Sequence, residues 1–497
     1  MESPTSTPQP KSSVLLDQLR ATLIATPPLC SGTLQVPTAD LELYYGRTDP
    51  KWVSLPSLFP PLRAALITFR FTHMHRPGVH RFLDFTTVAQ RIAELEALEN
   101  ACEPASFGKN RETVLDETYR KAGKMEPDTF MTRFNIELNG LVDVVRQALL
   151  AGEQEKKAID VELYKLNLYG KPPLFTSFTG KCAFFKPHLD TPRSDNMFAS
   201  LVVVFPTPHE GGELVLRHEG KEWTFDSARL LTGHSDRIAF AAFFSDVEHE
   251  CSPPPKRVPP AERLDILQPT QFNSDMVRDA LLNFLSNTEV LPDGGTLAFA
   301  LRHMYPVPIV TDVWTTESQS DLVGIVRAHL KGSDAALYEA CHALGLQPKL
   351  RLFMQDLWDH DDKFLFDDIK ALEAEPWEGS PYGIFKRKED VTLVKDGHLE
   401  GESDTSASEP HTIRPSRAHA QPVYWVTPHN KLNNSRWPFV GYGNQAGLAY
   451  EYVAVCLVAE APLAEERKNG VRAARASGFE GVKEEQTGAP HVVKEAL

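Results

Sequence analysis

A histidine and an aspartate separated by one residue stand near the middle of the chain, in the run FFKPHLDTPRSDNMF. In an extended strand, residues two apart point to the same face, so His188 and Asp190 would project together while Leu189 turns away. A second imidazole from a distant strand would complete a facial set of two nitrogens and one carboxylate, which leaves open positions on an octahedral Fe(II). His249 is the best candidate, because it lies 59 residues after Asp190 and follows the apolar run IAFAAFF.

Other polar residues of this region have simpler interpretations. An isolated H-x-D tripeptide occurs by chance in many chains, so the pair alone is weak evidence for a metal site. We assign structural or surface roles to three further histidines, His209 in the turn TPHEGG, His218 at a strand end and His234 in a polar loop. Arg193 and Asp195 are interpreted as solvated loop charges, with contact to a substrate as the alternative.

The pattern around these residues indicates a β-rich core between helical regions. From 161 to 244 short apolar runs alternate with Gly, Pro and Asp, which is typical of an antiparallel sandwich or barrel. The runs LVVVF and IAFAAFF are apolar on both faces and are expected to be its central strands. Helical periodicity is clearest in TTVAQRIAELEALENA, GLVDVVRQALLAGEQ and DMVRDALLNFLSN. The expected fold class is α+β.

Composition narrows the functional classes. The 497 residues carry a formal charge of −15, which disfavours sequence-independent binding to nucleic acid. The six cysteines form no C-x-x-C pair and no compact framework, as expected in a reducing compartment. The N-terminus lacks the apolar run of a signal peptide, and no stretch is long and apolar enough to span a membrane. We therefore expect a soluble intracellular protein, cytoplasmic or nuclear, with no membrane partner.

Several ordered motifs resemble one enzyme family. From about 161 to 250 the chain is similar to fungal iron(II) and 2-oxoglutarate-dependent dioxygenases with a prolyl 4-hydroxylase-like catalytic domain, in LYKLNLYG, FFKPHLDTPRSDNMFASLVVVFP, GGELVLRH and AAFFSDVEHE. The resemblance continues through LPDGGTLAFALRHMYPV, LKGSDAALYEACHALGL and YGNQAGLAYEYVAVCLVAEAP. It implies a double-stranded β-helix, or jelly roll, in which His188, Asp190 and His249 bind the iron.

The resemblance also implies the reaction. It indicates a dioxygenase that hydroxylates a C–H substrate while 2-oxoglutarate and O2 are converted to succinate and CO2, with Fe(II) as cofactor and ascorbate as a further candidate cofactor. The hydroxylated substrate, whether a protein or a small molecule, is not indicated by the sequence. Neither is the oligomeric state.

Two segments depart from the family pattern. The family places an Arg or Lys in a strand about ten residues after the distal histidine, to anchor the far carboxylate of 2-oxoglutarate. Here that segment is HECSPPPKRVPPAERLDILQ, whose prolines remove ladder donors. Arg257 and Arg263 remain candidates, and we favour Arg263 because RLDILQ alternates better. Tyr169 matches a family tyrosine that contacts the same carboxylate, but a long insertion separates it from His188, and a packed aromatic residue on a strand is the alternative interpretation. The altered segment is also compatible with an error in the gene structure.

The resulting interpretation divides the chain into seven segments. They are a disordered tail (1–13), an N-terminal mixed and largely helical region (14–155), the jelly-roll oxygenase domain (156–270), a helical or mixed region (271–373), a polar loop (374–421), C-terminal strands (422–463) and a disordered tail (464–497). Two other functions stay open: a non-catalytic jelly-roll protein that binds metal or a partner but has lost 2-oxoglutarate binding, and a metal-dependent hydrolase.

Overall fold

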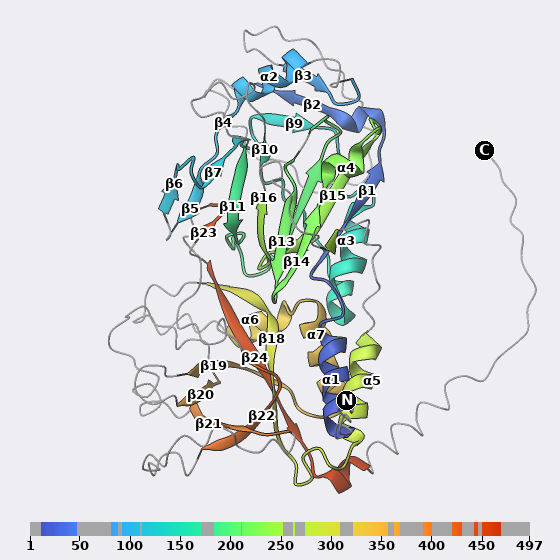
Figure 1. Cartoon of the computed structure of the whole chain (residues 1–497), viewed down its shortest axis with the longest axis vertical. Coiled ribbons are helices and arrows are strands. Elements are labelled where there is room, and N and C mark those ends of the chain that lie inside the picture. The colour runs from blue at the N-terminus through green and yellow to red at the C-terminus, as the bar shows by residue number, and fades with distance from the viewer. Residues whose placement is uncertain are drawn as a thin grey trace, which may run out of the picture.

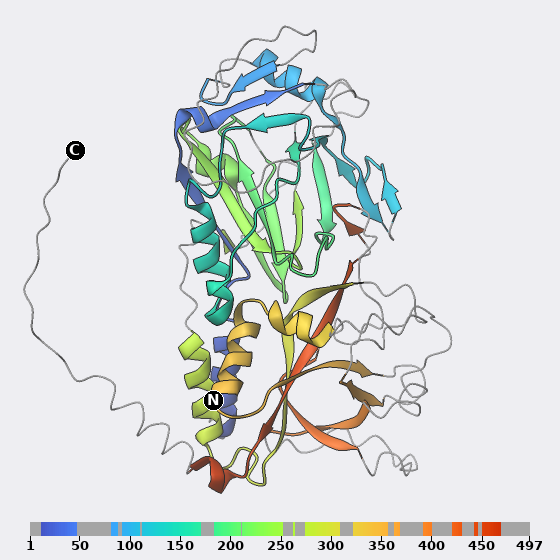
Figure 2. The ribbon, with the colours of Figure 1, turned by 180° about the vertical axis from the view of Figure 1, so that it is seen from behind.

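The computed structural model describes residues 11–46, 81–87, 92–109, 112–169, 183–209, 211–251, 262–263, 274–308, 322–355, 362–367, 391–399, 420–429, 442–445 and 450–468. These residues form a mixed α+β protein, as expected, with one body of sheets above a second body built on a barrel (Figures 1 and 2). Within these ranges no helix is sufficiently long and apolar to cross a membrane.

A six-stranded sheet is the largest element of the upper body. Its order is β17 (Glu262–Arg263), β14 (Lys221–Phe225), β13 (Leu214–His218), β16 (Glu248–Cys251), β11 (Phe184–His188) and β7 (Arg120–Lys121). A second sheet has the order β1 (Leu29–Gln35), β15 (Arg237–Phe244) and β12 (Ala199–Val204). From β11 to β16 the chain alternates between the two sheets, since β11, β13, β14 and β16 belong to the first and β12 and β15 to the second.

The core of the upper body lies between these two sheets. Leu216, Trp223 and Phe225 of the larger sheet share one buried cluster with Phe243 of β15. Almost all of β15 is apolar and buried, because it is paired on one side with β1 and on the other with β12. The predicted central position of IAFAAFF is therefore confirmed. The run LVVVF forms β12, whose described neighbour is β15 alone, and it is half-buried.

Short elements of the N-terminal region cover the upper body (Figure 1). The predicted helices are α2 (Ile92–Ala101) and α3 (Leu141–Leu149). Three small sheets have the orders β3 (Arg81–Asp84), β2 (Glu42–Tyr45), β9 (Phe130–Thr132); β10 (Leu166–Leu168), β8 (Gly123–Met125), β4 (Glu103–Pro104); and β23 (Tyr442–Gly443), β5 (Phe107–Lys109), β6 (Glu112–Val114). A short helix, α4 (Ser227–Leu231), precedes β15 and is capped by Asp226.

The lower body is a closed barrel with helices on one side (Figure 2). The barrel order is β18 (Gly295–Pro308), β22 (Gln421–Thr427), β21 (Val391–Gly397), β20 (Lys363–Phe366), β19 (Lys349–Gln355) and β24 (Tyr450–Ala461). The helices are α1 (Lys11–Leu23), α5 (Ser274–Ser286), α6 (Leu322–Ala328) and α7 (Gly332–Ala343). Leu19, Phe284 and Phe299 show why they associate: each is almost fully buried in one cluster that joins α1, α5 and β18.

The structure corrects two expectations about the N-terminus and the second half of the chain. Helix α1 begins at Lys11, inside the segment expected to be a disordered tail. The region 271–373 is mixed, as expected: it contains α5, α6 and α7 and supplies three barrel strands, β18, β19 and β20. The polar stretch 374–421 was expected to be a loop, yet VTLVKDG within it forms β21, where Leu393 and Val394 are buried. This short apolar run was not predicted as a strand because the residues around it are polar. It is stabilised by its pairing with β20 and β22.

Candidate metal centre

Two histidines stand opposite each other on neighbouring strands. His188 ends β11, His249 lies in β16, and the antiparallel register pairs these two residues directly. Their ring centroids are 4.2 Å apart, and both residues are buried. Cross-strand partners project from the same face of a sheet, so the pairing itself brings the two imidazoles together.

A β-bulge turns His188 toward this face. The register shifts between Phe185, which pairs with Cys251, and His188, which pairs with His249. From Phe185 to His188 the chain advances by three positions, while the partner strand advances by two, from Cys251 to His249, so β11 holds one extra residue. Pro187 lies within this bulge and has no N–H to donate to the neighbouring strand. As a result Phe185 and His188 face the same side, and their rings stack with centroids 3.5 Å apart.

Asp190 completes the predicted group of three. It follows β11 beyond Leu189, it is buried, and its Oδ1 lies 3.8 Å from Nε2 of His249. Ligand atoms of His188, Asp190 and His249 all lie within 4.8 Å of one another. The structure thus brings together the three residues that the sequence nominated as metal ligands.

The hydrogen bonds of the two imidazoles determine which nitrogen faces the centre. Nδ1 of His188 lies 2.9 Å from the carbonyl oxygen of Lys186, and Nδ1 of His249 lies 3.0 Å from that of Val247. A carbonyl oxygen only accepts, so each Nδ1 carries a proton, and Nε2 is the nitrogen that each ring can offer to a metal. Burial, followed by the neighbouring His249, lowers the pKa of His188 well below its usual value. The ring is therefore neutral, as a metal ligand has to be.

Both carboxylate oxygens of Asp190 are held by donors from other elements. Ser200 Oγ, on β12, donates to Oδ2, and the side-chain amide of Asn444 donates to Oδ1. The hydroxyl of Tyr452, on β24, lies 2.9 Å from the main-chain oxygen of Asp190. Sequence reasoning missed these three residues. Asn444 and Tyr452 do fall within YGNQAGLAYEY, one of the runs that carried the family resemblance.

A buried arginine shares the face that carries the metal ligands. Cys251 follows His249 by two positions in β16, Cys251 pairs with Phe185, and Phe185 pairs with Arg120 of β7. This row places the Arg120 side chain beside that of Phe185, and its guanidinium carbon lies 4.3 Å from the Phe185 ring centroid. The order of groups is therefore His188, then Phe185, then Arg120.

Arg120 retains a free donor. Nη1 donates to the main-chain oxygen of Ser106 at 2.6 Å, and Nη2 donates to Oδ1 of Asn167 at 2.9 Å. Nε is buried and has no hydrogen-bond partner among the described residues, none of which forms an ion pair with this guanidinium. A buried guanidinium without an acidic partner is a ready site for an anion.

Tyr169 lies beside this arginine. Burial raises the pKa of Tyr169 well above its usual value, Cys251 also raises it, and Arg120 acts in the opposite direction. The hydroxyl therefore keeps its proton, and it forms side-chain hydrogen bonds with Cys251 and Arg120.

The two arginines nominated from the sequence are placed differently. Arg257 lies outside the described residues. Arg263 belongs to β17, which is at the edge of the six-stranded sheet opposite to β7. Its backbone pairs with Thr224 of β14, Thr224 pairs with Val215 of β13, and Val215 pairs with Glu250 of β16. Glu250 is the neighbour of His249 in β16, and neighbouring residues of a strand face opposite sides of the sheet. Their assignment as carboxylate anchors stays a prediction.

The other polar residues of this region take structural positions. Nε2 of His209 lies 2.9 Å from Ser227 Oγ, Arg193 forms an ion pair with the exposed Glu162, and the main-chain nitrogen of His234 donates to Leu231.

The half-buried His218 and the buried Asp246 and His303 form a second group whose ligand atoms lie within 4.8 Å of one another. Here Lys331 Nζ lies 2.7 Å from Oδ1 of Asp246, and both side chains are almost fully buried. Burial alone would raise the pKa of Asp246, but Lys331 and His303 hold it well below its usual range. The ammonium supplies the positive charge that a metal ion would bring, so we interpret this group as a buried ion-pair network between the two bodies.

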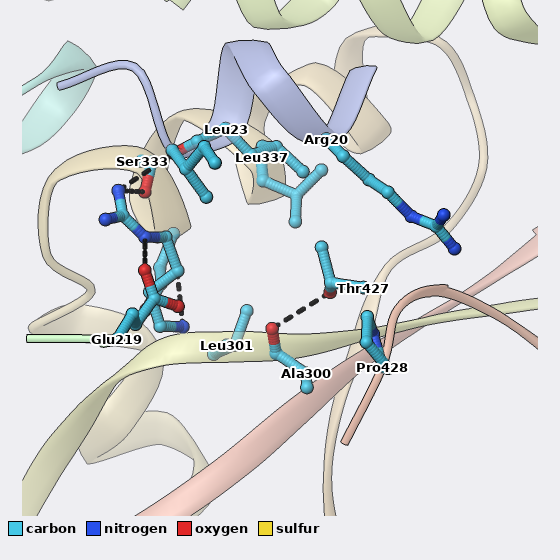
Figure 3. Close-up of a pocket in the computed structure, with 12 residues that line it drawn as sticks. Arg20, Leu23, Glu219, Ala300, Leu301, Ser333, Leu337, Thr427 and Pro428 are labelled. Carbon is cyan, nitrogen blue, oxygen red and sulfur yellow. Dashed lines mark hydrogen bonds and ion pairs between the residues drawn. The ribbon is translucent and has the colours of Figure 1, made fainter. Parts of the chain in front are cut away.

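A cavity of about 220 Å³ lies between α1, β18 and α7, lined by Arg20, Leu337 and Thr427 among others (Figure 3). Its buried arginine is already engaged, because Arg302 Nε donates to Glu219 at 2.6 Å and Nη1 donates to the Leu23 carbonyl at 2.9 Å. The protein's own groups thus use the donors that would attract an anionic ligand.

Comparison with protein-family models and with curated proteins gives no match for this chain. The functional argument therefore depends on the geometry of the metal centre and the residues around it.

Proposed function

We propose that the protein is an Fe(II) and 2-oxoglutarate-dependent dioxygenase that hydroxylates a C–H bond of its substrate. The single observation that carries this proposal is the buried group of His188, Asp190 and His249, whose ligand atoms all lie within 4.8 Å of one another. Two neutral imidazoles and a carboxylate are the donor set of non-haem Fe(II) oxygenases. When bound there, the iron would supply activation of O2 and chelation of the keto acid.

The path of the chain supports a jelly-roll interpretation of the upper body. A double-stranded β-helix passes repeatedly between two facing sheets, which is the alternation observed from β11 to β16. In this arrangement the end of β11 and the start of β16 meet, so the proposed ligands come from neighbouring strands of one sheet.

Arg120 and Tyr169 are proposed to hold the far carboxylate of 2-oxoglutarate. The free Nε–H of Arg120 and the protonated hydroxyl of Tyr169 would both donate to that anion, which satisfies a buried donor that otherwise has no partner. Phe185 lies between Arg120 and His188, so a ligand that reaches from the metal to the guanidinium would pass along this ring.

Aromatic side chains limit the access of water to the proposed centre. The ring of Phe185 stacks on His188, and the ring of Phe243 lies 4.7 Å from that of His249, centroid to centroid. A centre with apolar walls protects a reactive oxidant from side reactions. The second proposed role of the Phe185 ring is to help bury His188, since burial lowers the pKa of that imidazole.

The experiment measures succinate formed from 2-oxoglutarate by the purified protein with Fe(II), ascorbate and air. We expect succinate from the wild type and none from His249→Ala, while His209→Ala, a control histidine in a loop of the same body, should match the wild type. Metal binding without any succinate would instead support a non-catalytic metal-binding protein. Metal-dependent hydrolysis of an ester, amide or phosphate test substrate without O2 would support a hydrolase.

A further inference from the structure

A short segment of the C-terminal half reaches the proposed metal centre. Gly443 of β23 pairs with Gly108 of β5 and also forms a parallel bridge with Leu189, the residue between the two ligands of the H-x-D pair. Figure 1 shows β23 beside the upper body and β24 running down into the barrel. Residues 442–445, which we name the clasp, therefore lie against the metal corner although they are about 250 positions away in sequence.

Asn444 makes the central contact of the clasp. Its Nδ2 donates to Oδ1 of Asp190, and its Oδ1 accepts from the main-chain nitrogen of Thr191 at 3.1 Å. Only one orientation of the amide satisfies both partners, because the carboxylate needs a donor and the N–H needs an acceptor. The side chain is thus fixed by two residues of the metal corner.

Further bonds hold the clasp and the corner together. Thr191 Oγ1 donates to the main-chain oxygen of Gln445 at 2.6 Å. Tyr452 Oη, which is buried, lies 2.9 Å from the main-chain oxygen of Asp190 and 3.0 Å from that of Ser245. Burial raises the pKa of Tyr452 well above its usual value, so the hydroxyl keeps the proton that it donates.

We propose that Asn444 is a positioning residue that orients the Asp190 carboxylate for the metal, so that the C-terminal half of the chain completes the metal centre. Asn444 occupies one lone pair of Oδ1 and Ser200 binds Oδ2, which fixes the plane of the carboxylate and leaves the second lone pair of Oδ1 on the side of His249 Nε2. Partners of this kind orient ligating side chains and typically contribute 10-fold to 100-fold in metal affinity. This inference rests on the metal site of the proposed function.

The test compares metal affinity in full-length variants. Asn444→Ala removes both contacts, and Asn444→Leu removes them while keeping nearly the same volume. Gln445→Ala is the matched control, because it alters the clasp and its side-chain bond to Tyr164 without removing a side-chain contact to Asp190. Co(II) affinity is measured without O2 by competition with a chelator, together with the visible spectrum of bound Co(II) and the melting temperature of the metal-free protein.

We expect both Asn444 variants to bind Co(II) about 10-fold to 100-fold more weakly and to show an altered Co(II) spectrum. Gln445→Ala should bind as the wild type does, even if its metal-free melting temperature falls as far. Co(II) affinities of the Asn444 variants within twofold of the wild type would overturn the inference and leave the proposed function intact. A wild type that binds no metal would instead overturn the proposed function, and this inference with it.

Discussion

Replacement of Arg120 by Met should weaken the preference of the protein for a keto acid with a second carboxylate. The guanidinium has at least one free buried donor, Nε–H, after its bonds to Ser106 and Asn167 are counted. A hydrogen bond between charged groups contributes about 1.5–3 kcal/mol. This free energy corresponds to a change in affinity of roughly 10-fold to 150-fold.

The assay titrates the metal-loaded protein without O2, by calorimetry, with 2-oxoglutarate and with 2-oxovalerate, which has a methyl group in place of the far carboxylate. In the wild type, 2-oxoglutarate should bind more tightly than 2-oxovalerate, by at least roughly 10-fold to 150-fold. In Arg120→Met this preference for 2-oxoglutarate should fall by the same factor, roughly 10-fold to 150-fold, because the guanidinium no longer binds the far carboxylate while the Tyr169 hydroxyl remains. Arg467→Met is the control: Arg467 is also buried, but it donates to main-chain oxygens of Val290 and Leu291 in the lower body.

The reasoning about Arg120 would be refuted if Arg120→Met bound metal and kept the wild-type preference for 2-oxoglutarate. In that case the same titration with Arg263→Met and Arg257→Met would identify which of the arginines predicted from the sequence anchors the carboxylate. Measuring both keto acids on the same variant separates a loss of carboxylate binding from a loss of protein stability, because any loss of folded protein affects both titrations equally.

Three further predictions concern stability. Lys331→Met should lower the free energy of unfolding by about 3–5 kcal/mol, because it leaves the carboxylate of Asp246 buried without its partner; denaturant titration checks this, and a loss below about 1 kcal/mol would contradict it. Burial raises the pKa of Glu99 from 4.5 to about 7, so the folded state holds a proton that the unfolded state releases, and stability from this group falls as pH rises between those values. Glu99→Gln should therefore be more stable than the wild type at about pH 8, by at most about 3 kcal/mol, and no more stable near pH 4; equal melting curves at both pH values would exclude the effect. Phe243→Ala should cost about 3–5 kcal/mol in thermal or denaturant unfolding, since its ring is buried against both sheets and His249; an unchanged midpoint would show that this contact is unimportant.

The metal ligands could be nominated from the sequence because their signal is local. His188 and Asp190 are two residues apart, and His249 follows the most apolar strand of the chain, which had to lie in the core. The bulge at Pro187 was not predicted, although it turns Phe185 and His188 to the same face. A register shift depends on how two strands pair, which a single sequence does not specify.

The residues around the ligands could not be found in this way because they depend on distant pairing. Arg120 reaches the centre through a two-residue strand, β7, that pairs with β11, and a strand of this length has no periodicity to detect. Asn444 lies 254 residues from Asp190, on a segment that returns from the barrel. The barrel itself was missed for a similar reason: β18 is apolar along almost its whole length, so its pattern did not show which strands would close around it.

The most direct test of the central claim is anaerobic binding of Fe(II) to the wild type and to His188→Ala, measured as metal content after removal of free ion. The account predicts one tightly bound equivalent in the wild type and a large loss of affinity in the variant, with the folded β-sheet signal of both proteins unchanged. Equal iron content in the two folded proteins would show that His188 does not hold the metal and would contradict the account.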